Sequence, residues 1–284
     1  MIVYQHHIMW YESKMISETL DSLQQALDYF SPTDFKFVLC LNSQTYLEKP
    51  IEGTPTDMLL GFINHPVLKG SRIIYKTEHE PFYNIGDWRR EQYYPEAKYT
   101  VWGESDCLLP KELFFVLENV NFPTPHILTF SSRKMWDSSW DCVEHKDLLQ
   151  YKRISDINYG APQHLNSHDV ITQKQLNDFN EGCENVEIVK LPSHKIDGSL
   201  VCISGDINQK FIPDEVHFVR EDTCFEKFCI KKGIPQYHAT NLIKGHNYAH
   251  PLKRTNTNSK RTDDLFKKYS EESSAAVEKF LISL

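Results

Sequence analysis

The first 110 residues alternate strand-like runs with helical segments, and this alternation restricts the possible folds more than any other feature of the sequence. Residues 13–29 place apolar side chains at helical spacing, and residues 84–93 form a second helical segment that ends before Pro95. Strand-like runs precede, separate and follow these helices, at residues 2–9, 35–41, 72–75 and 99–102. Strands that alternate with helices predict an α/β domain with a mostly parallel central sheet.

The second half of the chain is less regular. A strand at residues 200–204 and a helix that ends at Gly233 are its clearest elements. A polar linker follows Pro251, and an amphipathic helix then places apolar side chains at Leu265, Phe266, Tyr269, Val277, Phe280 and Leu281. We therefore expect one domain over residues 1–252, followed by a linker and a C-terminal helical extension over residues 253–284.

The composition is typical of a folded protein from a reducing compartment. The 284 residues, 40% of them hydrophobic, are enough to bury a full core. Seven scattered cysteines without C-x-x-C pairs indicate reduced thiols, and no apolar run approaches the ~20 residues of a membrane span. The first residues lack the basic segment and cleavage site of a signal peptide. We expect a cytoplasmic protein, in the host cytoplasm if it is viral, with no membrane and no protein partner.

Two acidic residues, Glu104 and Asp106, follow the strand at 99–102. Side chains two residues apart in an extended chain point to the same side, so the two carboxylates could converge on one cation. Ligands of parallel sheets bind beyond the carboxyl ends of the strands, which is where this pair lies. The alternative is a solvated turn, because acidic triplets of this kind are common by chance. The context of the pair therefore has to decide between them.

That context consists of several motifs in a fixed order. The segments are WYESKMISETLDSLQQAL, FYNIGDWRREQYYPEAKYTVWGESDCLLPKEL, GSLVCISGDINQKF, VREDTCFEKFCIKKG and KGHNYAHP. In this order they resemble the conserved blocks of GT-A glycosyltransferases of the large family 2, over roughly residues 1–250. The resemblance implies a single Rossmann-like GT-A domain. Its nucleotide-sugar-binding half would span residues 1–110, and its acceptor-binding half residues 111–252.

The resemblance also implies a metal-dependent sugar transfer from a nucleotide sugar, with UDP as the nucleotide. Asp106 would bind Mn²⁺ or Mg²⁺ together with His246 or His250, and Glu104 would bind the ribose or a metal-bound water. Asp222 matches the carboxylate that removes the acceptor proton in inverting relatives. Its neighbour Glu221 would contact the acceptor. The alternative for both acids is a favourable charge in the first turn of a helix.

Three further residues match donor-binding positions of the same family. Asn42 stands where relatives carry an aspartate that reads uracil, and its amide could accept a hydrogen bond from the base. Asn84 and Arg89 belong to a helix whose start would face the diphosphate. For Arg89 an ordinary solvent-facing position is the alternative.

The acceptor is the least determined part of the prediction. An acid-free basic stretch over residues 244–262 includes Lys253 and Arg254, and it would contact a polyanion, either the diphosphate or nucleic acid. The chain as a whole resembles phage-encoded sugar transferases that modify hydroxymethylated bases in DNA. A glycan, a lipid-linked sugar or a protein is the alternative acceptor. A module that binds nucleotide or glycan without catalysis is the alternative function. A nucleotidyltransferase would need a glycine-rich basic loop after the first strand, and residues 6–13 lack one.

Overall fold

The computed structural model describes residues 1–9, 12–44, 60–77, 79–134, 172–181, 185–217, 220–246 and 264–284. The strands are β1 (Ile2–Met9), β2 (Phe35–Asn42), β3 (Arg72–Lys76), β4 (Tyr99–Gly103), β5 (Cys107–Leu108), β6 (Ile127–Lys134), β7 (Ile188–Lys190), β8 (Leu200–Ser204) and β9 (Gln236–His246). The helices are α1 (Ser13–Tyr29), α3 (Ile85–Glu91), α4 (Leu113–Asn119), α5 (Gln173–Asn180), α6 (Glu221–Lys232) and α8 (Asp264–Ser283), with a 3₁₀ turn, η2 (Pro66–Leu68).

All of these strands belong to one sheet, in the order β3-β2-β1-β4-β8-β6-β9-β5, with β7 paired to β9. The first four strands of this order are parallel to one another. Strand β8 lies antiparallel between β4 and β6, β6 and β9 are parallel, and β5 and β7 are antiparallel to β9. The predicted α/β fold is confirmed. Its parallel part is the N-terminal half, and antiparallel strands enter in the second half.

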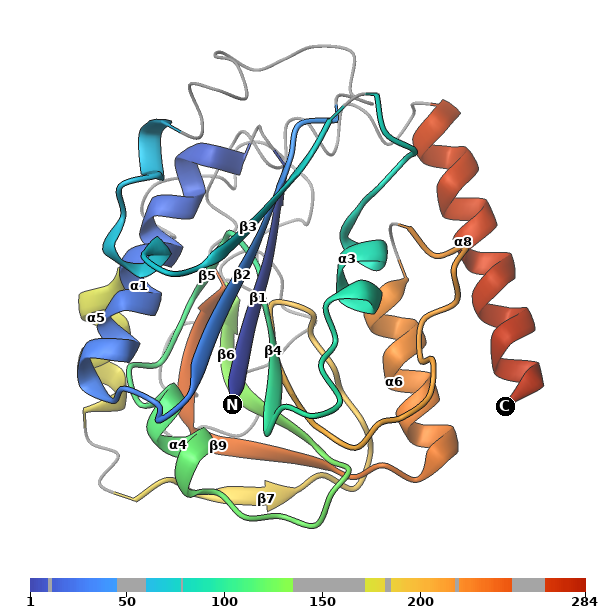
Figure 1. The fold of residues 1–284 in the computed structure, drawn as a ribbon. Helices are drawn as coiled ribbons and strands as arrows, with labels where there is room; N and C mark the ends of the chain where they lie inside the picture. Colours follow the sequence, from blue (N-terminus) through green and yellow to red (C-terminus); the bar gives the residue numbers. More distant parts are fainter. Residues whose placement is uncertain are drawn as a thin grey trace, which may run out of the picture.

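Helices cover both faces of the sheet. Helices α1 and α5 lie on one side, and α3, α6 and α8 lie on the other (Figure 1). Successive residues of the central strands therefore enter different cores: Tyr4 packs with the α1 side, whereas Val3 packs with Trp88 of α3. Burial on both faces is typical of parallel strands, and it explains why these runs are apolar without strict alternation.

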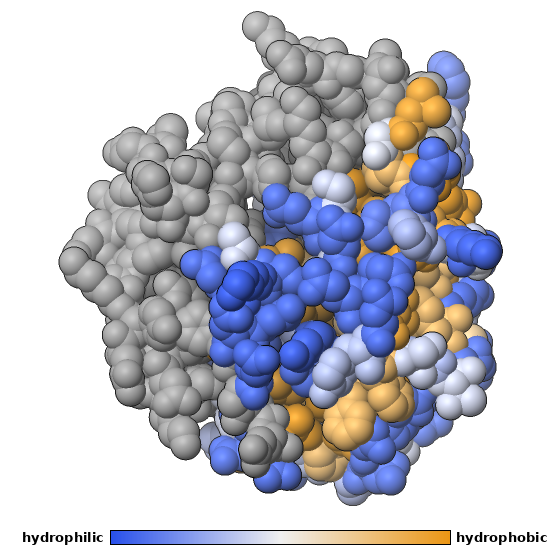
Figure 2. All heavy atoms as spheres, turned by 90° about the vertical axis from the view of Figure 1, so that its left-hand side faces the viewer, coloured by the Kyte–Doolittle hydropathy of each residue, from blue (hydrophilic) through white to orange (hydrophobic). Residues whose placement is uncertain are grey.

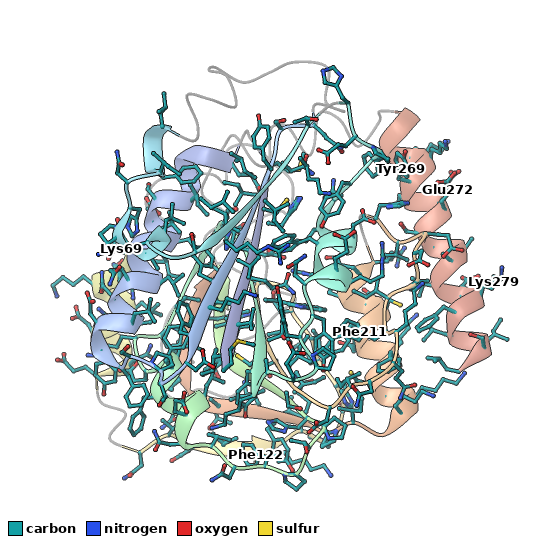
Figure 3. The ribbon with its side chains drawn as sticks, in the orientation of Figure 1. Lys69, Phe122, Phe211, Tyr269, Glu272 and Lys279 are labelled. Carbon is teal, nitrogen blue, oxygen red and sulfur yellow. The ribbon has the colours of Figure 1, made fainter. Side chains whose placement is uncertain are left out.

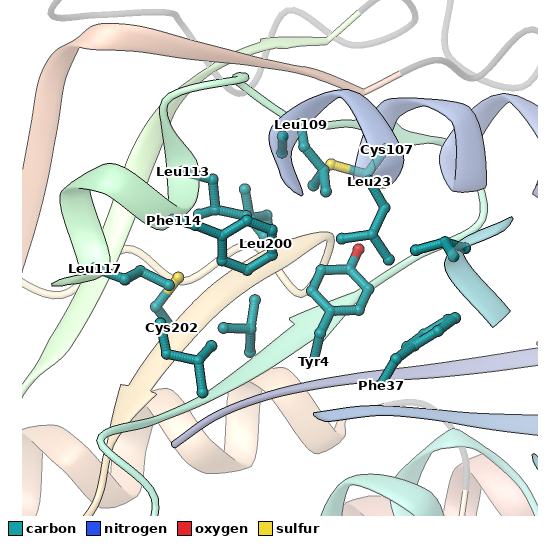
Figure 4. Close-up of a cluster of buried hydrophobic side chains, with 14 of the residues drawn as sticks. Tyr4, Leu23, Phe37, Cys107, Leu109, Leu113, Phe114, Leu117, Leu200 and Cys202 are labelled. Carbon is teal, nitrogen blue, oxygen red and sulfur yellow. The ribbon is translucent and has the colours of Figure 1, made fainter. Parts of the chain in front are cut away.

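The core on the α1 side joins both halves of the sheet. Tyr4 and Phe37 of the first strands pack with Leu23 of α1, Phe114 of α4 and Leu200 of β8 (Figure 4). The two phenyl groups of Tyr4 and Phe37 meet edge to face, with their ring centroids 5.7 Å apart. This packing fixes β4, which leads into the predicted acidic pair, together with its neighbour β8.

Helix α1 also holds the backbone of the turn after β4. The Thr19 hydroxyl donates a hydrogen bond to the Ser105 carbonyl (2.8 Å), and the Ser22 hydroxyl accepts one from the Leu109 amide (2.7 Å). The Ser105 hydroxyl lies 3.2 Å from Nε2 of His6 in β1. Polar groups that are satisfied inside a core hold one geometry. Helix α1 and strand β1 therefore hold the turn that carries Glu104 and Asp106 in place.

The predicted C-terminal helix is confirmed, and it packs on α6. Val277 is buried with Phe228, and Phe280 stacks on Phe228 with ring centroids 6.4 Å apart. Near the start of α8, Tyr269 points inward, whereas Glu272 and Lys279 point outward (Figure 3). Tyr269 stacks on Phe82, just before α3, at a centroid distance of 3.8 Å.

On the face shown in Figure 2, the coloured residues are hydrophilic in the centre and include hydrophobic areas to the right and below. None of the helices in the described part of the chain is both long enough and apolar enough to cross a membrane.

We predict that Gly86→Ala destabilises the protein by roughly 1–3 kcal/mol or more. The Gly86 amide donates to the His217 carbonyl (2.8 Å), and an added Cβ would lie 2.2 Å from the Val216 carbonyl oxygen. Backbone atoms cannot move aside as a side chain can, so α3 would be displaced. Urea unfolding of the variant and of the unsubstituted protein measures the loss.

Gly61→Ala is the matched control, because nothing lies within 4 Å of a Cβ at that position. Both substitutions restrict the unfolded chain equally. Equal free energies of unfolding for the two variants would show that the close approach at Gly86 is not a constraint.

Candidate active site

The predicted acidic pair lies where β4 leaves the core of the sheet. Glu104 follows β4 with a side chain that is 20% exposed, and Asp106 is buried. The Cys107 amide closes the turn by donating to the Glu104 carbonyl (3.1 Å). Strand β5 then pairs with β9 so that Cys107 lies opposite His246. The fold thus brings the backbone positions of Asp106 and His246 to the same edge. The His246 side chain and all of His250 lie outside the described residues.

Arg89 is the centre of the site. Its Nη1 donates to the Glu221 carboxylate (2.7 Å), and its Nη2 donates to the Glu104 carboxylate (3.1 Å) and to the Gly198 carbonyl (2.8 Å). The guanidinium carbon lies 4.4 Å from the centroid of the Trp102 ring, and the residue is only 1% exposed. The sequence placed Arg89 at a diphosphate. In the structure its guanidinium binds protein carboxylates and so joins the end of β4 to the start of α6.

The two acids at the start of α6 have raised pKa values. Burial raises the pKa of Glu221 to about 7, although the Arg89 guanidinium lowers it and the neighbouring Asp222 raises it. Burial also raises the pKa of Asp222, again against the lowering effect of Arg89. Asp222 Oδ1 accepts a hydrogen bond from the Thr223 amide (2.6 Å). Arg89 therefore holds Glu221, while Asp222 is fixed by the backbone of its own helix.

Arg220, the residue before α6, has a left-handed backbone with φ of 77°. A residue other than glycine adopts this conformation at a cost, and such residues are found most often at functional sites. It directs the chain into α6 so that Glu221 and Asp222 form the first turn.

Asn42 and Asn84 make contacts that organise the segment before α3. Asn42 Nδ2 donates to the Tyr83 carbonyl (2.7 Å), and its Oδ1 accepts from the Gln44 amide (2.9 Å). Asn84 caps α3 in a capping box with Asp87. Both ends of the Asn42 amide thus bind the protein, and the base contact that the sequence predicts for it remains a prediction.

A buried cluster that the sequence did not reveal lies beside Arg89. Lys244 of β9 donates to the Ser199 hydroxyl (2.7 Å), and this hydroxyl donates to the Asp197 carboxylate (2.7 Å). The Lys244 ammonium lies 3.7 Å from the same carboxylate and is almost fully buried. The sequence counted Lys244 in an exposed basic stretch. Spacing alone gives no signal that this lysine is inside the protein. Lys253 and Arg254, the other predicted members, lie outside the described residues.

The described part of the site holds more acidic than basic side chains. Five carboxyl groups lie near two buried cations: the acids are Glu104, Asp106, Asp197, Glu221 and Asp222, and the cations are Arg89 and Lys244. Carboxylate oxygens are the ligands that Mg²⁺ and Mn²⁺ prefer. Within the described residues, no three potential ligands lie close enough together to hold a metal by themselves. A divalent cation at Asp106 would therefore need further ligands from outside this group.

Comparisons with known proteins give matches only at the level of structure. No protein-family model matches the chain, and no curated protein sequence matches it. Among solved structures, the chain is similar to S. aureus TarS in complex with UDP, at 13% identity over 87% of this chain, with a TM-score of 0.41. It is also similar to the galactosyltransferase LgtC in complex with donor and acceptor sugar analogues, at 10% identity over 72% of this chain, with a TM-score of 0.34. The chain covers 58% of each of those chains.

We predict that Glu221→Gln removes a pH dependence from the stability of the protein. The folded pKa of Glu221, about 7, lies above the ordinary value of 4.5, so the folded state binds the proton more tightly than the unfolded state does. The contribution of Glu221 to stability is therefore present below pH 4.5 and is lost as the pH rises towards 7. Urea unfolding at several pH values between 4.5 and 8 measures this slope.

The informative quantity is the difference between wild type and Glu221→Gln at each pH, because groups common to both proteins cancel. This difference should fall between pH 4.5 and 7. A constant difference over this interval would mean that Glu221 titrates normally.

Proposed function

We propose that the chain is a glycosyltransferase that moves a sugar from a nucleotide-sugar donor, a UDP-sugar, to an acceptor hydroxyl. The observation that carries this proposal is the double ion pair of Arg89 with Glu104 and Glu221. It brings the acids after β4 and the acids at the start of α6 into one buried site at the carboxyl ends of the parallel strands, where α/β proteins bind ligands. The sequence motifs assigned a donor role to the first group and an acceptor role to the second.

The proposed reaction is a single displacement. The acceptor oxygen forms a bond to the anomeric carbon, the bond from that carbon to the diphosphate breaks, and the configuration inverts. Asp106 and His246 would hold a divalent cation, whose positive charge stabilises the leaving diphosphate. Glu104, fixed by Arg89, would orient the ribose or a water molecule. The proton of the acceptor hydroxyl goes to Asp222.

Asp222 suits the role of base better than Glu221 does. Glu221 is engaged by the Arg89 guanidinium, so its carboxylate is committed to the protein. The raised pKa of Asp222 makes it a stronger base than an exposed aspartate, and proton transfer is most efficient when the pKa of the base is near the working pH. The two neighbouring acids thus divide into one that positions and one that reacts.

The acceptor class is the part of the proposal that experiment has to select. A soluble glycan, a protein hydroxyl and hydroxymethylated duplex DNA are the candidates. The experiment offers a panel of nucleotide sugars with each acceptor and detects products by mass spectrometry. Transfer to one acceptor class supports the proposal and names that class. Binding of UDP without transfer to any acceptor would instead favour a binding module that lacks catalysis.

We predict that Asp222→Asn lowers kcat by about 100-fold or more and leaves the KM of the donor nearly unchanged. The base acts in the transition state and contributes little to ground-state binding. Steady-state kinetics with a saturating acceptor measure both constants, and NMR of the product gives its anomeric configuration.

Asp206→Asn is the matched control. Asp206 is exposed and has φ of 72°, a conformation that asparagine also tolerates. Normal turnover of Asp222→Asn, or a product that retains the donor configuration, would rule out Asp222 as the base of a single displacement.

We predict that Asp106→Asn abolishes transfer and weakens the metal-dependent binding of the nucleotide. Calorimetry of UDP binding with and without Mn²⁺ separates the two effects, because the loss should appear only in the presence of the ion. Full transfer by the wild-type enzyme in excess chelator would exclude the metal from the reaction.

A further inference from the structure

The turn at residues 197–199, just before β8, lies between the two buried cations of the site. On one side the Ser199 hydroxyl and the Asp197 carboxylate bind Lys244. On the other side the Gly198 carbonyl accepts a hydrogen bond from Arg89 Nη2. The turn is thus the direct physical link between β9 in the second half of the sheet and α3 in the first half.

The geometry of this turn is closely constrained. The Asp197 carboxylate accepts from both the amide (3.0 Å) and the hydroxyl (2.7 Å) of Ser199, which folds the turn onto itself. A Cβ at Gly198 would lie 2.9 Å from Arg89 Nη1 and 3.2 Å from a Glu104 oxygen. The turn therefore approaches the guanidinium closely, and a side chain at position 198 would require Arg89 or Glu104 to shift.

Lys244, which lies on β9, fixes the position of this turn. Lys244 is 1% exposed, and burial of a charge is costly unless its partners are well placed. A hydrophobic residue would stabilise the fold equally well or better at such a position, so a buried ion pair is weak evidence for a role in stability. The ion pair between Lys244 and Asp197 instead holds the turn at residues 197–199 in one position.

We propose that Lys244, acting through Ser199, is a positioning residue for the transfer reaction. The Lys244–Ser199–Asp197 network fixes the position of the Gly198 carbonyl, and this carbonyl helps to fix the Arg89 guanidinium. The guanidinium in turn holds the carboxylates of Glu104 and Glu221 beside Asp222. Because β9 carries Lys244 two residues before His246, the network also ties the predicted metal-binding end of β9 to the acids. This inference rests on the proposed glycosyltransferase activity.

The test compares Ser199→Ala with Ser204→Ala. Both serines are buried and hydrogen-bonded, and they lie at opposite ends of β8: Ser204 donates to the Gly205 carbonyl and accepts from the His126 amide. Loss of a buried hydroxyl should lower the melting temperature of the two variants similarly. Only Ser199→Ala should lower kcat, by about 10- to 100-fold, because it lets the acids move out of register with the acceptor. The KM of the donor should stay nearly unchanged.

Lys244→Met is the second variant, because methionine keeps much of the side-chain volume without the charge. If Lys244 and Ser199 act through one network, the kcat of the double variant should be only a little below that of the single variant with the lower kcat. Equal kcat values for Ser199→Ala and Ser204→Ala would overturn the proposal. So would fully multiplicative losses in the double variant.

A second measurement separates this proposal from the proposed function. The side-chain guanidinium signals of Arg89 in NMR spectra, assigned with Arg89→Lys, report its position without any substrate. They should shift or broaden in Ser199→Ala and stay unchanged in Ser204→Ala. If no nucleotide sugar is turned over by the wild type, the proposed function fails, and these signals alone decide whether the network holds Arg89. Unchanged Arg89 signals in Ser199→Ala would refute the network.

Discussion

The site depends on the burial of one guanidinium. Arg89 can be inside the protein only because two carboxylates and a backbone carbonyl satisfy its donors and the Trp102 ring covers its face. Glu104 and Glu221 are 117 positions apart in the chain, and Glu104 follows β4 whereas Glu221 begins α6. Each terminal nitrogen of the planar guanidinium donates to one of the two carboxylates, in a fixed geometry that the rotatable ammonium of a lysine would not impose. The same two ion pairs therefore fix both the position of α6 relative to the end of β4 and the arrangement of the acids.

The elements that the sequence predicted are those whose pattern is local. Strands β1, β2, β3, β4 and β8 and helix α1 lie within a residue or two of their predicted positions, because a continuous apolar run or a helical repeat marks each one. Strand β9 was missed, since its segment QYHATNLIKGH is polar and mixed in character. It is a strand because β6 pairs with it in parallel and β7 pairs with it antiparallel. Pairing partners that lie far away in the sequence leave no local signal.

The same distinction applies to the candidate site. The motif order placed Glu104, Asp106, Glu221 and Asp222 as a set, and the fold brings the residues of this set into one region. The partners of these acids could not be read in the same way. Arg89 looked equally suited to solvent, and Lys244 looked like part of a basic surface. Both bind the turn at 197–199, which is far from Arg89 and from Lys244 in the sequence.

The arrangement also has a consequence for the balance between stability and function. Five acids with two buried cations repel one another, and the raised pKa values of Glu221 and Asp222 show that burial disfavours their charged forms. The fold tolerates this because α1 and α6 fix the backbone on both sides of the site, through Thr19 and through the first turn that follows Arg220. The acids are therefore held together at some cost to stability, which is typical of residues that serve a function rather than the fold.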